Sequence, residues 1–327
     1  MKVIYTTILI LFVSLAVSNA QELFPHNEPA SSIPKGVFGV RYLQKNYQDI
    51  NVMKNMFALR FMYGLTPKLS IYSTITTTNH HGKDLPPNLV SHTHGNNNTT
   101  YSSATPDRGL KYPYLFSGIY LYAKYRFITI DSKNTHFRMA AYAEWSNVKV
   151  AHDETEPNLM DDTKGYGGGL IFTYLKNHFA VSLTSGVIIP GKFQGSSPDS
   201  AGPNIPTLVQ YGKAWQNNLS FGYLLYPRHY KNYKQTNINL YAEFISKTFE
   251  QAKVTQYGFV NVPINTPLLE AGYYVEVHPG IQGIFNSNLR VDLSVGFPLI
   301  NRSYAHYYPI FYLGVQRYFF RKSRKKA

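Results

Sequence analysis

Histidines cluster in one polar stretch of the chain. Four of its 11 histidines lie within fifteen residues, as the adjacent pair His80-His81 and the spaced pair His92-Thr93-His94. Neutral imidazoles this close together can bind Zn²⁺, Cu²⁺ or Ni²⁺. The chain has no cysteine and Asp84 is the only acid within this stretch, so a fixed structural metal site is not implied. One hypothesis is a metal-binding loop. The favoured one is a solvated surface loop, which could also fold inward and constrict a pore.

Charged residues recur at alternate positions of strand-length segments, opposite apolar residues. If these segments form a barrel, the charged side chains point into its lumen, where they need partners or water. The favoured interpretation is a set of ion pairs that fills a narrow interior, and the alternative is a charged, tyrosine-lined passage for small solutes. The candidate lumen-lining residues are Arg60, Lys124, Arg126, Arg138, Glu144, Glu243, Lys247, Glu270, Glu276, Arg290 and Asp292.

Nucleophilic catalysis has no convincing residue set in this sequence. Ser91 and His92 are adjacent, and neighbours on a strand point to opposite faces. The stretches 94–96 and 152–154 contain histidine with amide or acid but no serine. The run GYGGG at 165–169 lacks the Lys-Ser/Thr of a phosphate loop. We predict that the protein is not an enzyme and has no cofactor.

These side chains lie on segments that alternate apolar and polar residues with the two-residue period of a strand. Short turns alternate with longer connections, which we place at 79–113, 151–164, 190–206 and 250–267. This pattern predicts an all-β fold, a single antiparallel up-and-down transmembrane β-barrel of about twelve strands. The expected strands are 36–44, 56–65, 69–78, 114–130, 137–146, 165–175, 179–189, 212–226, 237–249, 268–278, 289–298 and 309–320.

Polar or glycine-containing stretches are expected to connect some of these strands. The polar stretch 45–55 is expected to connect the first two strands, and 279–288 to turn the chain between the tenth and eleventh. The last strand, PIFYLGVQRYFF at 309–320, is amphipathic and ends on aromatic residues, so we expect it to close the barrel against 36–44.

Composition agrees with a membrane barrel. The chain is 15% aromatic and only 15% charged, whereas soluble proteins carry roughly 25% charged residues. No mature segment approaches the ~18 to 20 continuous apolar residues of a membrane helix. The net charge is +14, but six of these charges are Lys2 and five cations in the last seven residues. We therefore predict no nucleic-acid partner, and a basic tail near anionic headgroups.

The N-terminus predicts the compartment. Met1-Lys2, an apolar core and Ser18-Asn19-Ala20 form a secretory signal peptide with cleavage after Ala20. We divide the chain into a signal peptide (1–20), an irregular N-terminal lead-in (21–35), an outer-membrane β-barrel (36–320) and a basic tail (321–327). The expected localisation is the cell outer membrane of a Gram-negative bacterium.

Short motifs near both ends of the chain resemble a known family. The hairpin YGLTPKLSI at 63–71, HPGIQ at 278–282, NLR at 288–290, GFPL at 296–299 and LGVQRYF at 313–319 are similar to hairpins of bacterial outer-membrane proteins. That family is named for the meta-pathway of phenol degradation, and the resemblance implies an outer-membrane channel or transport role. The aromatic-rich composition is also similar to that of Bacteroidetes outer-membrane proteins.

The sequence thus predicts a passive channel or uptake component for small solutes. Two alternatives stay open: a filled barrel with a structural or adhesive role, and a barrel that captures divalent metal on the loop 79–95 through His80, His81, His92 and His94. The expected partners are outer-membrane lipid and the barrel-assembly machinery, with small solutes or divalent metal as possible cargo.

Overall fold

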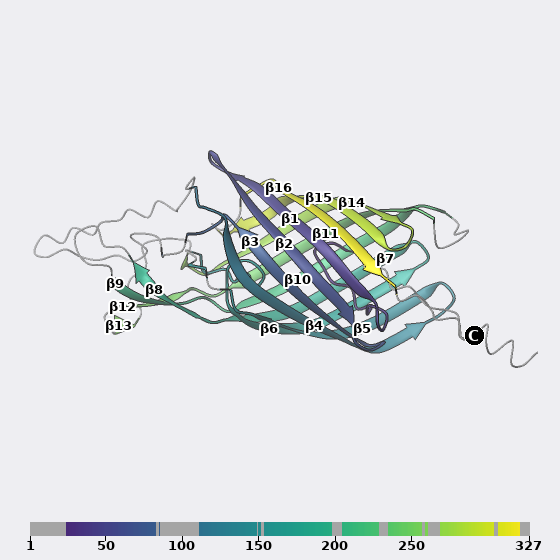
Figure 1. Ribbon diagram of the computed structural model, residues 1–327, viewed down its shortest axis with the longest axis horizontal. Helices are drawn as coiled ribbons and strands as arrows, with labels where there is room; N and C mark the ends of the chain where they lie inside the picture. Colours follow the sequence, from purple (N-terminus) through teal and green to yellow (C-terminus); the bar gives the residue numbers. More distant parts are fainter. Residues whose placement is uncertain are drawn as a thin grey trace, which may run out of the picture.

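The computed structural model describes residues 24–82, 85, 111–148, 150–151, 154–197, 205–228, 235–256, 259–260, 269–303 and 307–320. Within these residues, twelve antiparallel strands form one closed barrel (Figure 1). The predicted all-β barrel of twelve strands is therefore confirmed. Its strands are β1 (Phe38–Asp49), β2 (Val52–Gly64), β3 (Leu69–Thr78), β4 (Leu115–Asp131), β5 (Thr135–Ser146), β6 (Gly165–Lys176), β7 (Phe179–Pro190), β10 (Ala214–Tyr226), β11 (Asn237–Phe249), β14 (Gly272–Phe285), β15 (Leu289–Arg302) and β16 (Ile310–Phe319).

The first and last strands close the barrel, as the sequence predicts. The β1–β16 ladder runs from Phe38 opposite Phe319 to Tyr47 opposite Ile310. Along β16, Ile310 and Tyr312 are buried, whereas Phe311 and Phe319 are exposed. The two-residue period therefore separates an inward from an outward set, as expected for a barrel strand.

Large apolar side chains cover the outward face of the wall. Phe61, Ile71, Leu121 and Trp145, on four adjacent strands, are each exposed to a degree that is unusual for a soluble protein. This is the arrangement that a lipid-facing barrel wall requires. In the part of the chain that the structure describes, no helix is long and apolar enough to span a membrane.

Two expected connections belong to strands instead. Most of 45–55 is paired, because β1 continues to Asp49 and β2 begins at Val52. Likewise β14 continues through 279–285 and turns only at Asn286 and Ser287, both with positive φ. The sequence assignment was wrong at these places because polar residues and glycines do not prevent pairing where a ladder continues beyond the apolar band.

The two ends of the barrel differ. The turn end carries short connections such as 65–68, 132–134 and 286–288, and β16 ends there (Figure 1). The loop end carries a second sheet, with strand order β13-β12-β9-β8, which our assignment of 190–206 and 250–267 as plain connections missed. Its strands are β8 (Lys192–Ser197), β9 (Ile205–Gln210), β12 (Lys253–Gln256) and β13 (Phe259–Val260).

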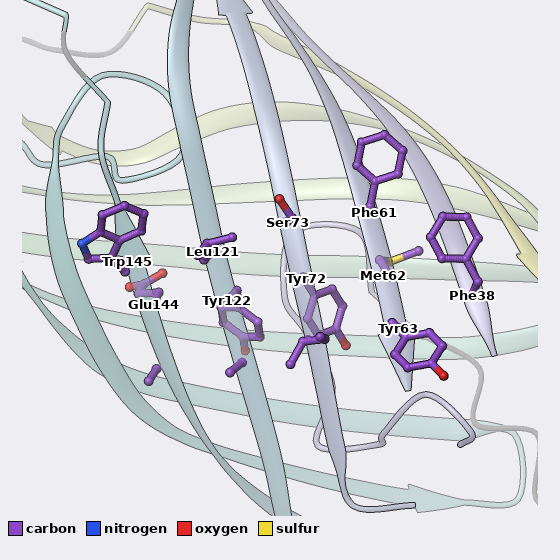
Figure 2. Close-up of a pocket in the computed structure, with 13 residues that line it drawn as sticks. Phe38, Phe61, Met62, Tyr63, Tyr72, Ser73, Leu121, Tyr122, Glu144 and Trp145 are labelled. Carbon is purple, nitrogen blue, oxygen red and sulfur yellow. The ribbon is translucent and has the colours of Figure 1, made fainter. Parts of the chain in front are cut away.

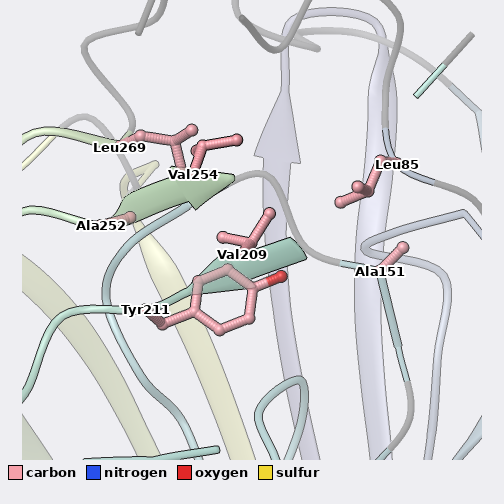
Figure 3. Packing of buried hydrophobic residues seen from close by; sticks show 7 residues of the cluster. All are labelled: Leu85, Ala151, Val209, Tyr211, Ala252, Val254 and Leu269. Carbon is pink, nitrogen blue, oxygen red and sulfur yellow. The ribbon is translucent and has the colours of Figure 1, made fainter. Parts of the chain in front are cut away.

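This outer sheet has a small apolar core of its own (Figure 3). Val209 of β9 and Val254 of β12 face each other across paired residues and are fully buried. Leu85 and Leu269 from the flanking segments complete the cluster, together with Ala151, Tyr211 and Ala252. The core gives the loop end a fixed structure outside the barrel wall.

Candidate functional site

The N-terminal segment Phe24–Val37 lies inside the barrel, at its turn end. Phe24, Ala30 and Ile33 are almost completely buried. Phe24 packs against Ala180 of β7 and Tyr241 of β11, and Ala30 packs in a different cluster against β5 and β6. A segment that contacts strands all around the wall occupies the lumen. The lead-in that the sequence presents as irregular is therefore an internal plug, which we call the N-terminal segment.

Wall side chains accept hydrogen bonds from the backbone N–H groups of this segment. The N–H groups of His26 and Asn27 donate to the two carboxylate oxygens of Glu243, at 3.0 and 2.9 Å. The N–H of Ala30 donates to Thr173 Oγ1 at 2.8 Å. Buried N–H groups need such partners, and the prolines at positions 25, 29 and 34 supply none, which prevents an ordinary strand ladder here.

The carbonyl groups of the segment are matched by wall cations. Arg41 Nη2 donates to Pro25 O at 2.8 Å, and Lys124 Nζ donates to Pro29 O at 2.7 Å. Arg290 Nη2 reaches Phe24 O at 3.2 Å, while its Nε donates to Asp292 Oδ2 at 2.7 Å. The wall is thus complementary to an extended backbone, with acceptors facing N–H groups and cations facing carbonyl groups.

Glu28 makes the ion pairs at the middle of the segment. Its Oε1 lies 2.9 Å from Arg60 Nη1, and its Oε2 lies 3.4 Å from Lys124 Nζ. Arg60 also donates to Thr74 Oγ1 of the neighbouring strand at 3.1 Å, which fixes the guanidinium. The same carboxylate therefore joins the N-terminal segment to β2 and β4.

A second insertion enters the lumen from the loop end. Residues 154–164, which we call the inward loop, belong to the connection between β5 and β6. Glu156 Oε1 accepts from Lys247 Nζ at 2.7 Å and from Tyr274 OH at 2.9 Å. Leu159 is buried among side chains of β4, β7, β11 and β14. The sequence suggested the histidine-rich loop as a possible constriction, whereas the described constriction comes from this other loop.

The two insertions meet at Arg60. One guanidinium nitrogen, Nη1, pairs with Glu28, and the other, Nη2, lies 3.4 Å from Met160 Sδ of the inward loop. A ladder of tyrosines lines the wall beside this meeting point. The rings of Tyr72, Tyr122 and Tyr142 follow one another at 5.3 Å between centroids. The described lumen is therefore occupied from both ends.

The structure places the predicted charged residues as follows. Eight lie buried inside the barrel, namely Lys124, Arg138, Glu144, Glu243, Lys247, Glu276, Arg290 and Asp292. Arg60 is half-buried beside Glu28, and Arg126 lies at the turn end, where it donates to Pro67 O at 3.0 Å. Glu270 differs from the expectation, because it is exposed and precedes β14. Most of these groups hold the two insertions or pair with one another, as Arg290 does with Asp292 at 2.7 Å.

The histidine pair anchors the inward loop. His80 Nδ1 lies 3.0 Å from Asp161 Oδ2, and His81 Nε2 lies 3.8 Å from Asp162 Oδ2. Burial lowers the pKa of His80 below its usual value, although Asp161 acts in the opposite direction. His92 and His94 lie outside the described residues, and within those residues no group of three acids or imidazoles is arranged to hold a metal. The metal hypothesis stays a prediction.

One serine–histidine contact escaped the sequence reasoning. His26 Nε2 lies 2.9 Å from Ser294 Oγ, and the two residues are 268 positions apart. Glu243 accepts from the backbone of His26 and not from its ring, so it does not orient the imidazole. The nearby acid Glu276 is bound to His278. This contact lacks the oriented base that nucleophilic catalysis needs, and the absence of an enzymatic role remains a prediction.

The outer wall carries an apolar hollow of about 530 Å³ over β1 to β5 (Figure 2). Small residues form its floor, among them Ser73 of β3 and Ala123 of β4, and exposed rings such as Phe61 and Trp145 surround it. Its exposed rings lie on the outward face, and the one charged residue of its lining, Glu144, has a buried side chain, so the hollow suits the lipid side of the wall. The polar chemistry of the molecule is inside.

The chain was compared with known proteins. No family model and no curated protein matches it. Among solved structures, it is similar to an outer membrane channel from Pseudomonas putida F1, with 13% identity and a TM-score of 0.52 over 91% of this chain and 100% of that one. The β domain of the Bordetella autotransporter BrkA has 11% identity and a TM-score of 0.39, covering 87% and 100%. Outer membrane phospholipase A from Escherichia coli has 11% identity and 0.34, covering 93% and 99%.

These likenesses concern the fold. The first supports a barrel of the outer-membrane type over nearly the whole chain. The other two have TM-scores too low for a detailed comparison. The resemblance to the phenol meta-pathway family stays a prediction.

Proposed function

We propose that this protein is an outer-membrane channel for small solutes, and that the N-terminal segment closes it. The observation that carries the proposal is the match between the wall and the segment. Glu243, Thr173, Arg41 and Lys124 bind main-chain groups of residues 25–30. A barrel whose only task was to be filled could use wall side chains alone, as narrow barrels do. A separate segment that lies in the lumen can leave it.

The fold likeness to an outer membrane channel supports the same proposal. The apolar outward wall supports localisation in the outer membrane, with lipid around the twelve strands of the barrel. We further propose that the barrel-assembly machinery acts on the closing strand β16, and that a secretory signal peptide delivers the chain.

The second candidate is a filled barrel with a structural or adhesive role. It is favoured by the inward loop, whose Leu159 and Glu156 occupy the lumen even apart from the N-terminal segment. The outer sheet would then be the working surface. The two candidates make opposite predictions about a barrel without residues 24–34.

The deciding experiment is single-channel recording in planar bilayers. We expect the full chain to show rare, brief openings and the variant lacking residues 24–34 to show sustained current. Lys35 and Gly36 are kept so that Gly36 N can still bond Gly64 O, a contact of 2.8 Å that shapes the entry to β1. Heat-modifiable gel mobility establishes that both proteins are folded. A folded deletion variant that passes no current would overturn the channel proposal and favour the filled barrel.

A further inference from the structure

The ion pairs of Glu28 join two cations of the wall to a single acid of the segment. Both cations, Arg60 and Lys124, belong to barrel strands, and the acid belongs to the segment. Among the residues that the structure describes, Glu28 is the one carboxylate within ion-pairing distance of either cation. Lys124 is fully buried. The charge balance of this part of the wall therefore depends on a group that departs with the segment.

Withdrawal of the segment removes hydrogen-bond and ion-pair partners from both cations. Lys124 loses both Glu28 and Pro29 O, and Arg60 loses its carboxylate partner. A buried cation without a partner is costly, so an open lumen favours an anion at this position or water in its place. The guanidinium keeps its orientation through Thr74, and a fixed guanidinium fork matches the two oxygens of a carboxylate.

The tyrosine rings around the cations suit the uncharged body of an organic carboxylate. Lys124 Nζ lies 5.6 Å from the centroid of the Tyr72 ring, and the ring of Tyr122 packs edge-on against Tyr72 at 5.3 Å. Tyrosine rings provide flat apolar surfaces with polar edges. A small carboxylate with a flat or apolar body can therefore place its charge on the cations and its body on the rings.

We propose that Arg60 and Lys124 form a binding site for small organic carboxylates, which Glu28 occupies in the closed channel. The inference rests on the proposed function, because the site becomes free when the N-terminal segment leaves the lumen. In the closed state, the Glu28 carboxylate takes the place of the solute carboxylate. Solute and segment then compete for the same two cations, so the solute that the channel admits also favours its open state.

Benzoate and benzamide test the site, because they share a ring and differ in charge. In the variant lacking residues 24–34, we expect benzoate to reduce the small-ion current by binding in the lumen, and benzamide to have little effect. Replacing the cations with R60Q and K124Q in the same background should raise the half-blocking benzoate concentration by about tenfold or more. R138Q serves as the matched control, since this wall cation has its own acid, Asp131, at 3.3 Å.

A second measurement does not depend on current. E28Q in the full chain keeps the shape of the side chain but removes the competing charge. We expect benzoate to raise the temperature at which folded E28Q loses its compact gel mobility, and to have no such effect on E28Q combined with R60Q and K124Q. Benzamide should protect neither protein.

The outcomes separate the two proposals. A folded deletion variant without current would overturn the channel itself. A conducting deletion variant in which benzoate and benzamide act alike, or in which R60Q and K124Q leave the benzoate block unchanged, would overturn the carboxylate site and leave the channel standing. Equal loss of block in R138Q would also overturn it, because the effect would then reflect the overall charge of the lumen.

Discussion

The N-terminal segment and the inward loop both occupy the lumen, but they are held in different ways. Wall residues Glu243, Thr173 and Lys124 bind backbone groups of the segment. The ion pairs of Glu28 and the burial of Phe24 add side-chain contacts. The inward loop is held through side chains, by the burial of Leu159 and the Lys247 contact of Glu156. Within the described residues, the segment joins one barrel strand, β1, whereas the loop joins β5 and β6.

This difference indicates which insertion can move. A segment joined to one strand can leave the lumen as a unit, and water can replace the hydrogen bonds of its backbone. A loop joined to a strand at each end can shift but cannot leave the lumen as a unit. Withdrawal of either insertion exposes apolar side chains, Leu159 of the loop or Phe24 and Ile33 of the segment. The segment is therefore suited to act as a gate, and the loop to narrow the lumen permanently.

The largest expected effect comes from removing the inward loop instead of the N-terminal segment, and then from removing both. Replacing residues 156–162 with a short Gly-Ser linker should leave the channel closed, because the N-terminal segment still fills the turn end. Combining this replacement with the deletion of residues 24–34 should give a larger conductance than that deletion alone, because both constrictions are gone. Planar bilayer recording measures both. Sustained current from the loop replacement alone would contradict the assignment of the gate to the segment.

The next effect concerns the acceptor that the wall offers to the segment. E243L leaves the N–H groups of His26 and Asn27 without their carboxylate, at a cost of about 1–3 kcal/mol for each unsatisfied group. The chain has no cysteine, so a single S32C substitution in the buried segment reports withdrawal by maleimide labelling. We expect labelling of S32C to accelerate by about tenfold or more in the E243L background.

Two controls make that result specific. S132C, in an exposed turn at the same end of the barrel, should label at the same rate with and without E243L. E144Q changes another buried wall acid, one that accepts from Tyr120 OH at 2.6 Å and makes no hydrogen bond or ion pair with the described residues of the segment. It should leave S32C labelling unchanged. Acceleration by E144Q equal to that by E243L would indicate general loosening of the barrel.

The wall of the barrel could be predicted from the sequence, because each strand carries its own evidence. Alternation along 309–320 is enough to place Phe311 outward and Tyr312 inward, and the closing pair β1–β16 follows from the order of the strands. The ends of the strands were harder to predict. Polar residues such as Tyr47 and Lys54 still pair where the ladder extends beyond the apolar band. A pattern of hydrophobicity shows where the band ends and not where the hydrogen bonds end.

The contents of the lumen could not be predicted in this way. Pro25, Pro29 and Pro34 make the N-terminal segment look like a linker, because they rule out a helix or a strand. Its binding groups lie far away in the chain, as Glu243 does at 217 positions from His26. Such pairings leave no local pattern. The one sequence signal was an excess of inward cations, since Arg60, Lys124 and Arg126 have no acid on their own strands until Asp131.

The pH dependence of the inward loop should sharpen the comparison further. His80 is buried beside Asp161, with His81, Tyr47 and Lys45 nearby, and burial lowers its pKa from 6.5. The anchored loop thus favours neutral His80, whereas a released His80 binds a proton near pH 6.5. Anchoring is complete above that pH and is lost as the pH falls below it toward the lowered pKa.

Hydrogen exchange measures this anchoring at the amides of Asp161, Asp162 and Thr163, which donate to Asn158 O in the native loop. After correction for intrinsic rates, we expect their protection to decrease between pH 7.5 and 5.5. H80N removes the titrating group and should make the protection independent of pH over this range. Equal pH dependence in H80N would assign the effect to another group.

The smallest expected effect comes from removing single tyrosine hydroxyl groups, one beside the segment and one beside the inward loop. Tyr312 OH accepts from Arg41 Nη2 at 2.9 Å, and the same nitrogen donates to Pro25 O of the segment. Tyr274 OH instead donates to Glu156 of the inward loop. Each hydrogen bond contributes about 0.5–1.5 kcal/mol, so Y312F should accelerate S32C labelling by roughly 2- to 12-fold. Y274F should leave that labelling unchanged and reduce amide protection at 161–163. If the two variants affected both readouts alike, the segment and the loop would be moving as one unit, and the gate would have to be assigned to both.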